Sequence, residues 1–325
     1  MREPPRSTKP ALAAAPAAAA PASEAPASAA PAAATLDTVE WEQTPDGVRS
    51  LRLGAARLRV TLDDRRYDLG ADALLDWVSR SARAIRDYYG AFPVREAELV
   101  VHATRGSGVH GGHTEPGTPP RIDIEVGERA SLLDLARNWS LAHEMVHLAV
   151  PNLARSQHWL EEGLASYVEP IARARAGLRD EKDVWREWRD NLARGLPEAD
   201  DRGLDHTPTW GRTYWGGALY CFLADLEIRK RSGGRFELRD ALRGILAAGG
   251  NINVDWPIER VLRAGDAATQ TDVLAQLYAQ MKDQPVRFDL AQIWRELGVS
   301  EQAGEIRYDD SAPLASVRAV FVRGR

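Results

Sequence analysis

The stretch LAHEMVHLAVPNLARSQHWLEEGLASYVE, residues 141–169, holds the pattern that decides the fold. His143 and His147 are four residues apart with Glu144 beside the first, and a third histidine and two adjacent glutamates follow. Residues four apart lie about 40° apart around an α-helix, so the two imidazoles point to the same side. Two such imidazoles can bind one metal ion at about 2.0–2.1 Å each. The sequence therefore predicts a metal site on a helix.

Glu144 lies next to the two histidines, where a carboxylate can act on a water at the metal without binding the metal itself. Zinc lowers the pKa of such a water, and a carboxylate that takes its proton leaves a hydroxide that can attack a polarised carbonyl. The pattern HExxH is short, but here it sits on an amphipathic helix, and burying histidines without partners is costly. We therefore expect one Zn²⁺ per chain, with Glu144 as the general base.

A catalytic zinc site usually has three protein ligands and one open position. The candidates for the third ligand are His158, Glu161 and Glu162. A third histidine would fit the metzincin pattern HExxHxxGxxH, but His158 comes too late and the glycine of that pattern is missing. The residue types alone leave the two glutamates open as ligands.

WLEEGLASY, residues 159–167, resembles the WLNEGFA segment of gluzincin peptidases, a group that includes the aminopeptidase N-like and glycyl aminopeptidase families. In these families the glutamate before the glycine is the third metal ligand, so the resemblance implies that Glu162 binds zinc and Glu161 does not. Fourteen residues separate His147 from Glu162. This interval is shorter than in aminopeptidase N-like enzymes and is similar to that of compact bacterial peptidase MA-like domains.

Two further positions follow from the same resemblance. Ser166 stands where thermolysin-like relatives have an aspartate that orients a ligand histidine, and a serine can accept the same imidazole N–H more weakly. GRTYWGGALYCFLADL, residues 211–226, resembles the Y-x-K-G stretch of aminopeptidase N-like enzymes, which implies that Tyr214 hydrogen-bonds the developing oxyanion. Gly216 occupies the usual lysine position. In the alternative interpretation, Tyr214 is an ordinary aromatic at a helix start, and Gly216 and Gly217 allow close helix packing.

The segment before the metal helix is expected to form one wall of the cleft. Gluzincins place there an edge strand that pairs with an extended substrate, and Arg121–Val126 is predicted to be that strand. Residues 105–120 are rich in Gly and Pro and are predicted to form a loop. The GxMEN signature of aminopeptidase N-like enzymes is absent, and Glu115 in this loop is the candidate group for binding a substrate amine. We expect Glu115, Ser166, Glu161 and His158 to support the ligands or to line the substrate cleft.

The order of predicted elements indicates the fold class. From Ser131, which forms a capping box with Asp134, a single helix is predicted to run to Pro151. Strands dominate before this helix and helices after it. This order predicts an α+β, zincin-like fold: a small N-terminal lobe with a sheet, then the HExxH helix, then a mainly helical lobe. Strands are predicted at 48–62, with a turn at Gly54, and at 97–103. A helix is predicted within 71–93, ending at Gly90 with Pro93 beyond it. Further helices are predicted at 159–173, 180–194, 212–231, 236–248 and 269–282, and a strand or hairpin within 305–322.

The 325-residue chain is long enough for one large domain, and we predict a single zincin-like catalytic domain over residues 36–325, with lobes at 36–150 and 151–325. Residues 1–35 are rich in Ala and Pro, and the prolines break the helix that alanine favours, so this segment is expected to be disordered. Its apolar part is interrupted too often for a signal-peptide core. It is either a simple tail or the tether of an exported or envelope-associated bacterial protein whose export signal or lipid anchor this chain lacks.

Composition narrows the classes of partner. The net charge of -5 at pH 7 argues against a general nucleic-acid partner, which normally needs a positive surface. The single cysteine, Cys221, excludes an internal disulfide. No run of about 18 apolar residues is present, so no transmembrane helix is expected.

These features together predict a zinc metallopeptidase of the gluzincin type that hydrolyses a peptide or protein substrate. One alternative is a zinc-stabilised binding or envelope-assembly module without turnover, and the intact Glu144 argues against it because a purely structural zinc site needs no base. The other is a zinc amidohydrolase that acts on a non-peptide amide, which would use the same water. The sequence leaves the oligomeric state open.

Overall fold

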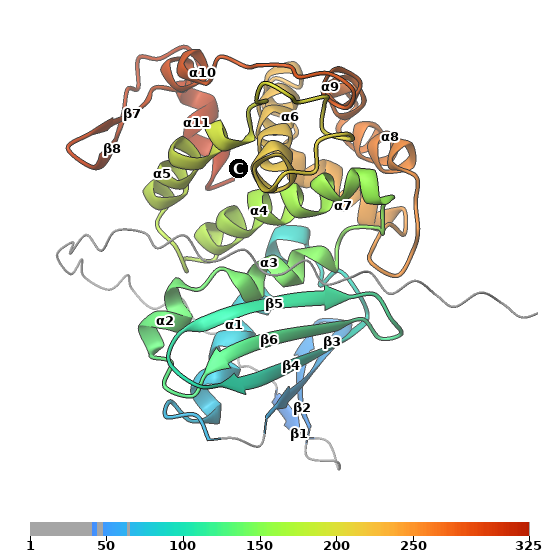
Figure 1. The fold of residues 1–325 in the computed structure, drawn as a ribbon, viewed down its shortest axis with the longest axis vertical. Coiled ribbons are helices and arrows are strands. Elements are labelled where there is room, and N and C mark those ends of the chain that lie inside the picture. Colours follow the sequence, from blue (N-terminus) through green and yellow to red (C-terminus); the bar gives the residue numbers. More distant parts are fainter. Residues whose placement is uncertain (1–40, 44–47, 64–65, 325) are drawn as a thin grey trace, which may run out of the picture. The chain divides into compact units, whose positions relative to one another are not determined.

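The computed structural model describes residues 41–43, 48–63 and 66–324, so the Ala/Pro-rich segment and the predicted start of the domain near residue 36 lie outside the described residues. In the described part a sheet comes first and a set of helices follows (Figure 1). The prediction of an α+β fold with an N-terminal sheet lobe and a mostly helical region is therefore confirmed. Within the same residues no helix is long and apolar enough to cross a membrane.

Six strands form the sheet: β1 (Trp41–Gln43), β2 (Arg49–Leu53), β3 (Ala56–Leu62), β4 (Glu96–Thr104), β5 (Val109–Glu115) and β6 (Arg121–Gly127). Their order across the sheet is β1-β2-β3-β4-β6-β5. The pairs β3–β4 and β4–β6 are parallel, and the other pairs are antiparallel. A parallel pair needs a crossover connection, and helix α1 (Ala71–Tyr89) provides it between β3 and β4. As predicted, α1 ends at Gly90, whose φ of 84° suits a glycine.

The remaining helices are α2 (Leu132–Arg137), α3 (Ser140–His147), α4 (His158–Arg175), α5 (Glu181–Asn191), α6 (Gly217–Arg231), α7 (Leu238–Ala247), α8 (Ile258–Thr269), α9 (Val273–Met281), α10 (Leu290–Leu297) and α11 (Ala315–Phe321). A π-helical turn, Gly211–Gly216, leads directly into α6. The sequence analysis did not predict α8 or α10. Of the strand or hairpin predicted within 305–322, one strand is present, β8 (Glu305–Tyr308). It pairs with β7 (Val299–Gln302), which precedes that segment, and the later residues form helix α11 instead.

Strand β5 shows that two predictions were wrong. The segment 105–120, predicted to be a loop, contains β5, and β5 is the edge strand of the sheet. Arg121–Val126 lies in β6, which pairs with both β4 and β5 and is therefore internal. One of the glycines that suggested a loop, Gly112, is required by packing: a Cβ there would lie 3.0 Å from Cγ of Glu144 and 2.8 Å from the carbonyl oxygen of Asp123.

The prediction of a single helix from Ser131 to Pro151 was also wrong, because the chain forms two helices there, α2 and α3. The predicted capping box of Ser131 and Asp134 opens α2. Asn138 then adopts an extended conformation with ψ 134°, and its side-chain oxygen accepts the Leu141 backbone N–H at 3.4 Å. Asparagine competes in this way with the helical hydrogen bonds. Helix α2 therefore ends before Asn138, and α3 begins as a separate helix at Ser140.

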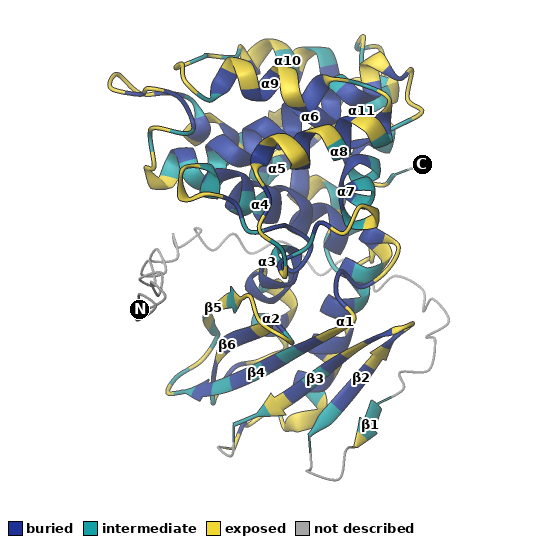
Figure 2. Cartoon of the chain, turned by 90° about the vertical axis from the view of Figure 1, so that its right-hand side faces the viewer, coloured by how far each residue is buried: buried dark blue, intermediate teal, exposed yellow. Residues whose placement is uncertain are grey.

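Helix α3 lies between the sheet lobe and the helical region, and it packs against α1, α4 and β5 (Figure 1). Helices α4 and α6 form the centre of the helical region, where Figure 2 shows them mostly buried. They cross with their backbones in contact: a Cβ on Gly163 would lie 2.3 Å from the backbone of Gly217. Only glycine fits at this crossing. The close contact between the two helices therefore fixes the position of the π-helical turn relative to α4.

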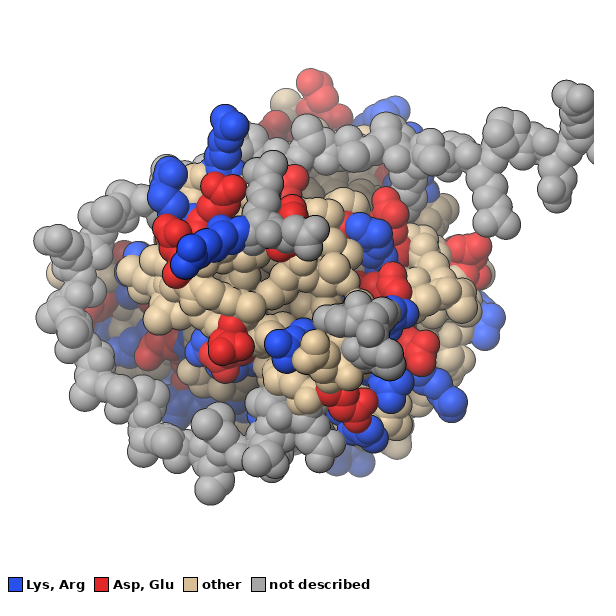
Figure 3. Space-filling model, turned by 90° about the horizontal axis from the view of Figure 1, so that it is seen from below, with Lys and Arg blue, Asp and Glu red and all other residues tan. Residues whose placement is uncertain are grey.

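The surface of the sheet lobe carries both signs of charge. Figure 3 shows basic and acidic side chains interspersed around an uncharged area on the face seen from below. On the sheet itself, Arg59 of β3 and Glu98 of β4 form an ion pair of 3.3 Å across neighbouring strands. Such mixed pairing leaves no large field of one sign on the face that Figure 3 presents.

Candidate metal centre

Helix α3 brings His143 and His147 together on one side. Their ring centroids are 5.0 Å apart and the rings are nearly perpendicular, at 79°. His143 is buried, and the side chain of His147 is 15% exposed. The apolar residues Met145 and Val146 on the rest of the helix are fully buried. The predicted geometry of two imidazoles on adjacent turns is therefore present in the folded chain.

Glu162, from helix α4, reaches the same point. Its Oε2 lies 3.2 Å from Nε2 of His143 and 3.8 Å from Nε2 of His147. Ligand atoms that bind one ion tetrahedrally at 2.0–2.1 Å are about 3.3 Å from one another. Oε2 of Glu162 therefore lies at roughly the distance from each imidazole nitrogen that sharing one ion would require.

Electrostatics at this point favours a charged carboxylate. Burial alone would raise the pKa of Glu162, but His147, His143 and His158 lower it to about 2. Burial is the largest single effect on His143 and lowers its pKa. The hydrogen bond and charge of Glu162, with the charges of Glu144 and Glu169, together outweigh burial, so the pKa of His143 is raised. The carboxylate thus stays ionised across the whole neutral range, as a metal ligand must be.

Glu144 is the second carboxylate at the site. Its side chain, together with the imidazoles of His143 and His147, offers ligand atoms that all lie within 4.8 Å of one another, so these three residues could hold a metal ion without Glu162. The hydroxyl of Thr114 on β5 donates to Oε2 of Glu144 at 2.8 Å and also lies 2.9 Å from its backbone carbonyl oxygen. The edge strand therefore fixes Glu144, while α4 fixes Glu162.

The adjacent glutamates of α4 have different surroundings. Glu161 accepts the backbone N–H of Leu153 at 2.8 Å through Oε1, and its Oε2 lies 2.7 Å from Nδ1 of His158. The other nitrogen of His158 lies 3.3 Å from Oε1 of Glu162. His158 therefore bridges the two glutamates, and Glu161 is held away from the two histidines of α3.

Tyr214 lies over His143 from the π-helical turn. The two rings are stacked at 6.4 Å with an angle of 23° between their planes. The tyrosine hydroxyl makes a hydrogen bond to Glu162, and burial, followed by the charges of Glu162 and Glu144, raises the pKa of Tyr214 well above its usual value. The phenol therefore keeps its proton, and π-helical turns of this kind are frequent at functional sites.

The side chains of two predicted site residues, Ser166 and Glu115, make no hydrogen bond to those of His143, His147 or Glu162 in the described part of the chain. Ser166 is partly buried on α4, and within the described residues its hydroxyl makes no hydrogen bond to His143 or His147. Glu115 is exposed on β5, where Oε1 lies 3.8 Å from Nε2 of His113. The structure therefore gives neither residue a contact with the proposed ligands.

The sequence analysis missed Thr114 and Glu169. Thr114 was missed because residues 105–120 were predicted to form a loop rather than a strand. Glu169 is buried on α4, pairs with Arg173 at 2.7 Å, and contributes to the raised pKa of His143. Its spacing of seven residues from Glu162 places both on one side of the helix, a signal that was available in the sequence.

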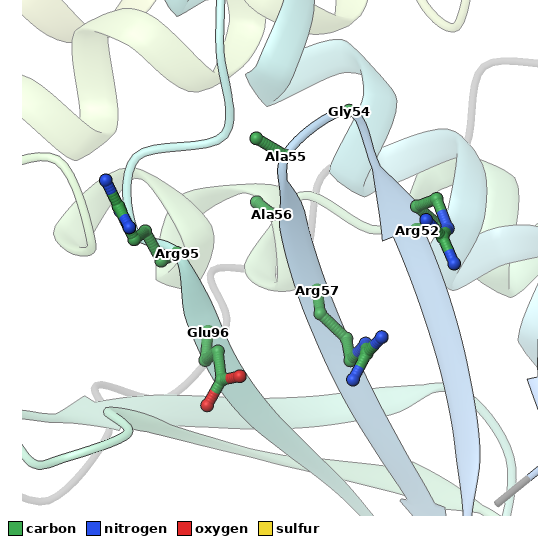
Figure 4. Close-up of a pocket in the computed structure, with 7 residues that line it drawn as sticks. All are labelled: Arg52, Gly54, Ala55, Ala56, Arg57, Arg95 and Glu96. Atoms are coloured by element: carbon green, nitrogen blue, oxygen red, sulfur yellow. The ribbon is translucent and has the colours of Figure 1, made fainter.

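A separate concavity at the turn between β2 and β3 does not belong to this site. It is lined by Arg52, Arg57, Arg95, Glu96 and small residues around Gly54 (Figure 4). The side chains of Arg52 and Arg95 point to opposite sides in this view, so they do not converge on one ligand. None of the histidines or carboxylates described above lines it.

Solved structures with a similar fold include an aminopeptidase N family protein from Idiomarina loihiensis, with a TM-score of 0.59 and 15% identity over 78% of this chain and 49% of that one. The chain has a gluzincin-type fold. Further matches are an M1 zinc metallopeptidase from Deinococcus radiodurans (TM-score 0.48, 15% identity, 77% of this chain and 53% of that one) and Legionella pneumophila aminopeptidase A in complex with aspartic acid (0.48, 14%, 76% and 28%).

The chain spans about half the length of the Idiomarina protein. No protein-family model and no curated relative matches its sequence. At 15% identity the likeness establishes the fold alone. The chemistry must therefore be argued from the residues of this chain.

Proposed function

We propose that this chain is a zinc-dependent peptidase in which His143, His147 and Glu162 hold one zinc ion. The observation that carries the proposal is the convergence of three ligand atoms from α3 and α4, with Oε2 of Glu162 at 3.2 and 3.8 Å from the two imidazole nitrogens. Two imidazole nitrogens and one carboxylate oxygen are a typical donor set for catalytic zinc, and they leave one position open. We assign Glu162 rather than Glu144 as the carboxylate ligand, because Oε2 of Glu162 approaches both imidazole nitrogens while Thr114 holds Glu144 toward the edge strand.

Glu144 is the general base of the proposed reaction. Bound zinc would acidify a water and polarise the substrate carbonyl. Thr114 holds one oxygen of the Glu144 carboxylate, and the other takes the proton from the attacking water and later passes it to the leaving amine. A base fixed in this way needs no reorientation between the two proton transfers.

Tyr214 donates a hydrogen bond to the oxyanion that develops on the substrate carbonyl. Its raised pKa keeps the phenol protonated, which is the form that a donor requires. The edge strand β5, which corrects the earlier assignment to Arg121–Val126, pairs with the extended backbone of the substrate. His158, anchored by Glu161, holds the oxygen of Glu162 that does not bind the metal.

The test is metal analysis of the purified protein, combined with cleavage of a peptide library by the wild type and by Glu144→Gln. We expect the variant to keep about one zinc per chain and to lose turnover by about 10²–10⁴-fold. Glu259→Gln, which removes an exposed carboxylate of α8, is the matched control and should cleave like the wild type. Equal cleavage by Glu144→Gln and wild type would refute the mechanism, and wild type without zinc would refute the site.

A further inference from the structure

A row of four rings runs through the candidate site. Trp139 contacts His143 at 5.1 Å between centroids, His143 stacks on Tyr214 at 6.4 Å, and Tyr214 contacts Trp210 at 5.9 Å. The two inner rings are those of a proposed zinc ligand and the proposed oxyanion donor. The two outer rings are indoles that leave large surfaces in solvent, since Trp139 is 51% exposed and Trp210 is 45% exposed.

The row includes two of the most exposed large apolar side chains of the described residues. In the part of the chain that the structure describes, four large hydrophobic residues are exposed: Leu132, Leu133, Trp139 and Trp210. Two of the four touch rings of the candidate site directly. Exposed apolar surface that adjoins a site marks the place where a ligand is bound. By contrast, Glu115 and His113 make the exposed part of β5 polar.

We propose that the indoles of Trp139 and Trp210, at the two ends of this row, bind large apolar side chains of the peptide close to the scissile bond, and that the enzyme therefore prefers aromatic or large aliphatic residues there. The inference rests on the proposed peptidase function. A carbonyl held at the zinc would lie beside His143 and Tyr214, so the adjoining side chain of the same peptide is within reach of the indoles that contact these rings. Indoles gain most from apolar and aromatic partners.

The two tryptophans can be changed without emptying the core, because both are about half exposed. The backbone carbonyl of Trp139 accepts the N–H of His143 at 3.1 Å, and this bond survives a change of side chain. Trp210 contacts the ring of Tyr214, which is not a proposed ligand. Trp210→Ala therefore tests the inference even where Trp139→Ala disturbs the metal.

The experiment uses two decapeptides that are identical except for Phe or Ala at one central position, offered together to the zinc-loaded full chain, with products read by mass spectrometry. We expect the wild type to favour the Phe peptide by about tenfold or more in kcat/KM, and Trp139→Ala and Trp210→Ala to reduce this ratio to about threefold or less. Trp210→Phe should retain most of the preference. Leu133→Ala, equally exposed but outside the row of rings, should leave the ratio unchanged.

A binding measurement separates this inference from the proposed function. Zinc-loaded Glu144→Gln is titrated with fluorescently labelled Phe and Ala peptides, with and without the added change Trp210→Ala. Cleavage without a preference for Phe overturns the inference and leaves the peptidase standing. Selective binding that disappears with Trp210→Ala, in a protein that cleaves neither peptide, supports the inference and overturns the peptidase. Absence of both cleavage and selective binding overturns both.

Discussion

The two sides of the candidate site are built differently. On the helical side, Glu162 is buried among His143, His147 and His158, and the backbones of α4 and α6 touch beneath it. On the strand side, β5 is the edge of the sheet and reaches the site through the hydroxyl of Thr114. Figure 2 shows the same contrast, with α4 and α6 mostly buried and β5 partly buried or exposed. Dense packing fixes the proposed ligands, and the open edge leaves backbone groups free for a substrate.

The largest expected effect lies on the helical side. Glu162→Ala should lower zinc affinity by more than the roughly 10–100-fold that loss of a supporting group costs, because it removes a proposed ligand. Glu161→Ala, its neighbour and matched control, should remain within that range, since Glu161 contacts His158 and the Leu153 backbone but neither histidine of α3. Competition with a metal-binding dye measures both affinities. Our ligand assignment is wrong if the Glu161 change strips the metal and the Glu162 change does not.

Tyr214→Phe probes the same side without changing its packing. The ring that stacks on His143 stays, and only the hydroxyl is lost, so zinc binding should be kept while kcat falls by about 10²–10³-fold. Since the pKa of Tyr214 lies well above its ordinary value, activity should not decline through this group when the pH rises from 7 to about 10. A Phe variant with wild-type kcat would show that Tyr214 is only a packing residue.

Gly163→Ala would break the contact between α4 and α6. The new Cβ would meet the Gly217 backbone at 2.3 Å, so we expect the free energy of unfolding to fall by about 1–3 kcal/mol and the position of Tyr214 to shift. Gly216→Ala is the milder control, because its Cβ would meet the end of the flexible Leu204 side chain at 3.0 Å. Denaturant unfolding compares the two. Equal stability of both variants would contradict a backbone crossing that only glycine permits.

The smallest effect is expected on the strand side. Thr114→Val removes the hydrogen bond to the Glu144 carboxylate, and a hydrogen bond to a charged group contributes about 1.5 kcal/mol, or about tenfold in kcat/KM. Zinc content and stability should be unchanged, since Thr114 contacts no proposed ligand. Steady-state kinetics on one cleaved peptide measures the effect. If this variant lost as much activity as Tyr214→Phe, the proposed difference between the two sides would not hold.

The sequence predicted features that depend on local spacing better than those that depend on distant pairing. The fold class, helix α1 and the capping box at Ser131 follow from patterns within a few residues of each other, and the structure confirms them. The edge position of β5 depends on pairing across the sheet. Gly112 made this segment look like a loop, but a glycine is needed there because the backbone packs against Glu144, 32 residues away in the sequence. The bend at Asn138 depends on a side chain competing with its own backbone.

The candidate site shows the same division. The approach of His143 and His147 could be predicted from their helical spacing alone. The position of Tyr214 depended on a family resemblance, because no local rule brings a π-helical turn to a helix more than 60 residues earlier. The bridge that His158 makes between two glutamates required knowing which way each carboxylate points.

The π-helical turn affects how easily the proposed oxyanion donor can be lost or regained by a single-residue deletion or insertion during evolution. A π turn is an α-helix with one residue too many, so loss of a single codon is enough to turn Gly211–Gly216 into an ordinary helical turn. Deleting Trp215, between Tyr214 and α6, would rotate the phenol by about 100° away from His143 while α6 keeps its own residues and packing. One deletion or insertion at this place can thus discard or restore the proposed oxyanion donor without rebuilding the core.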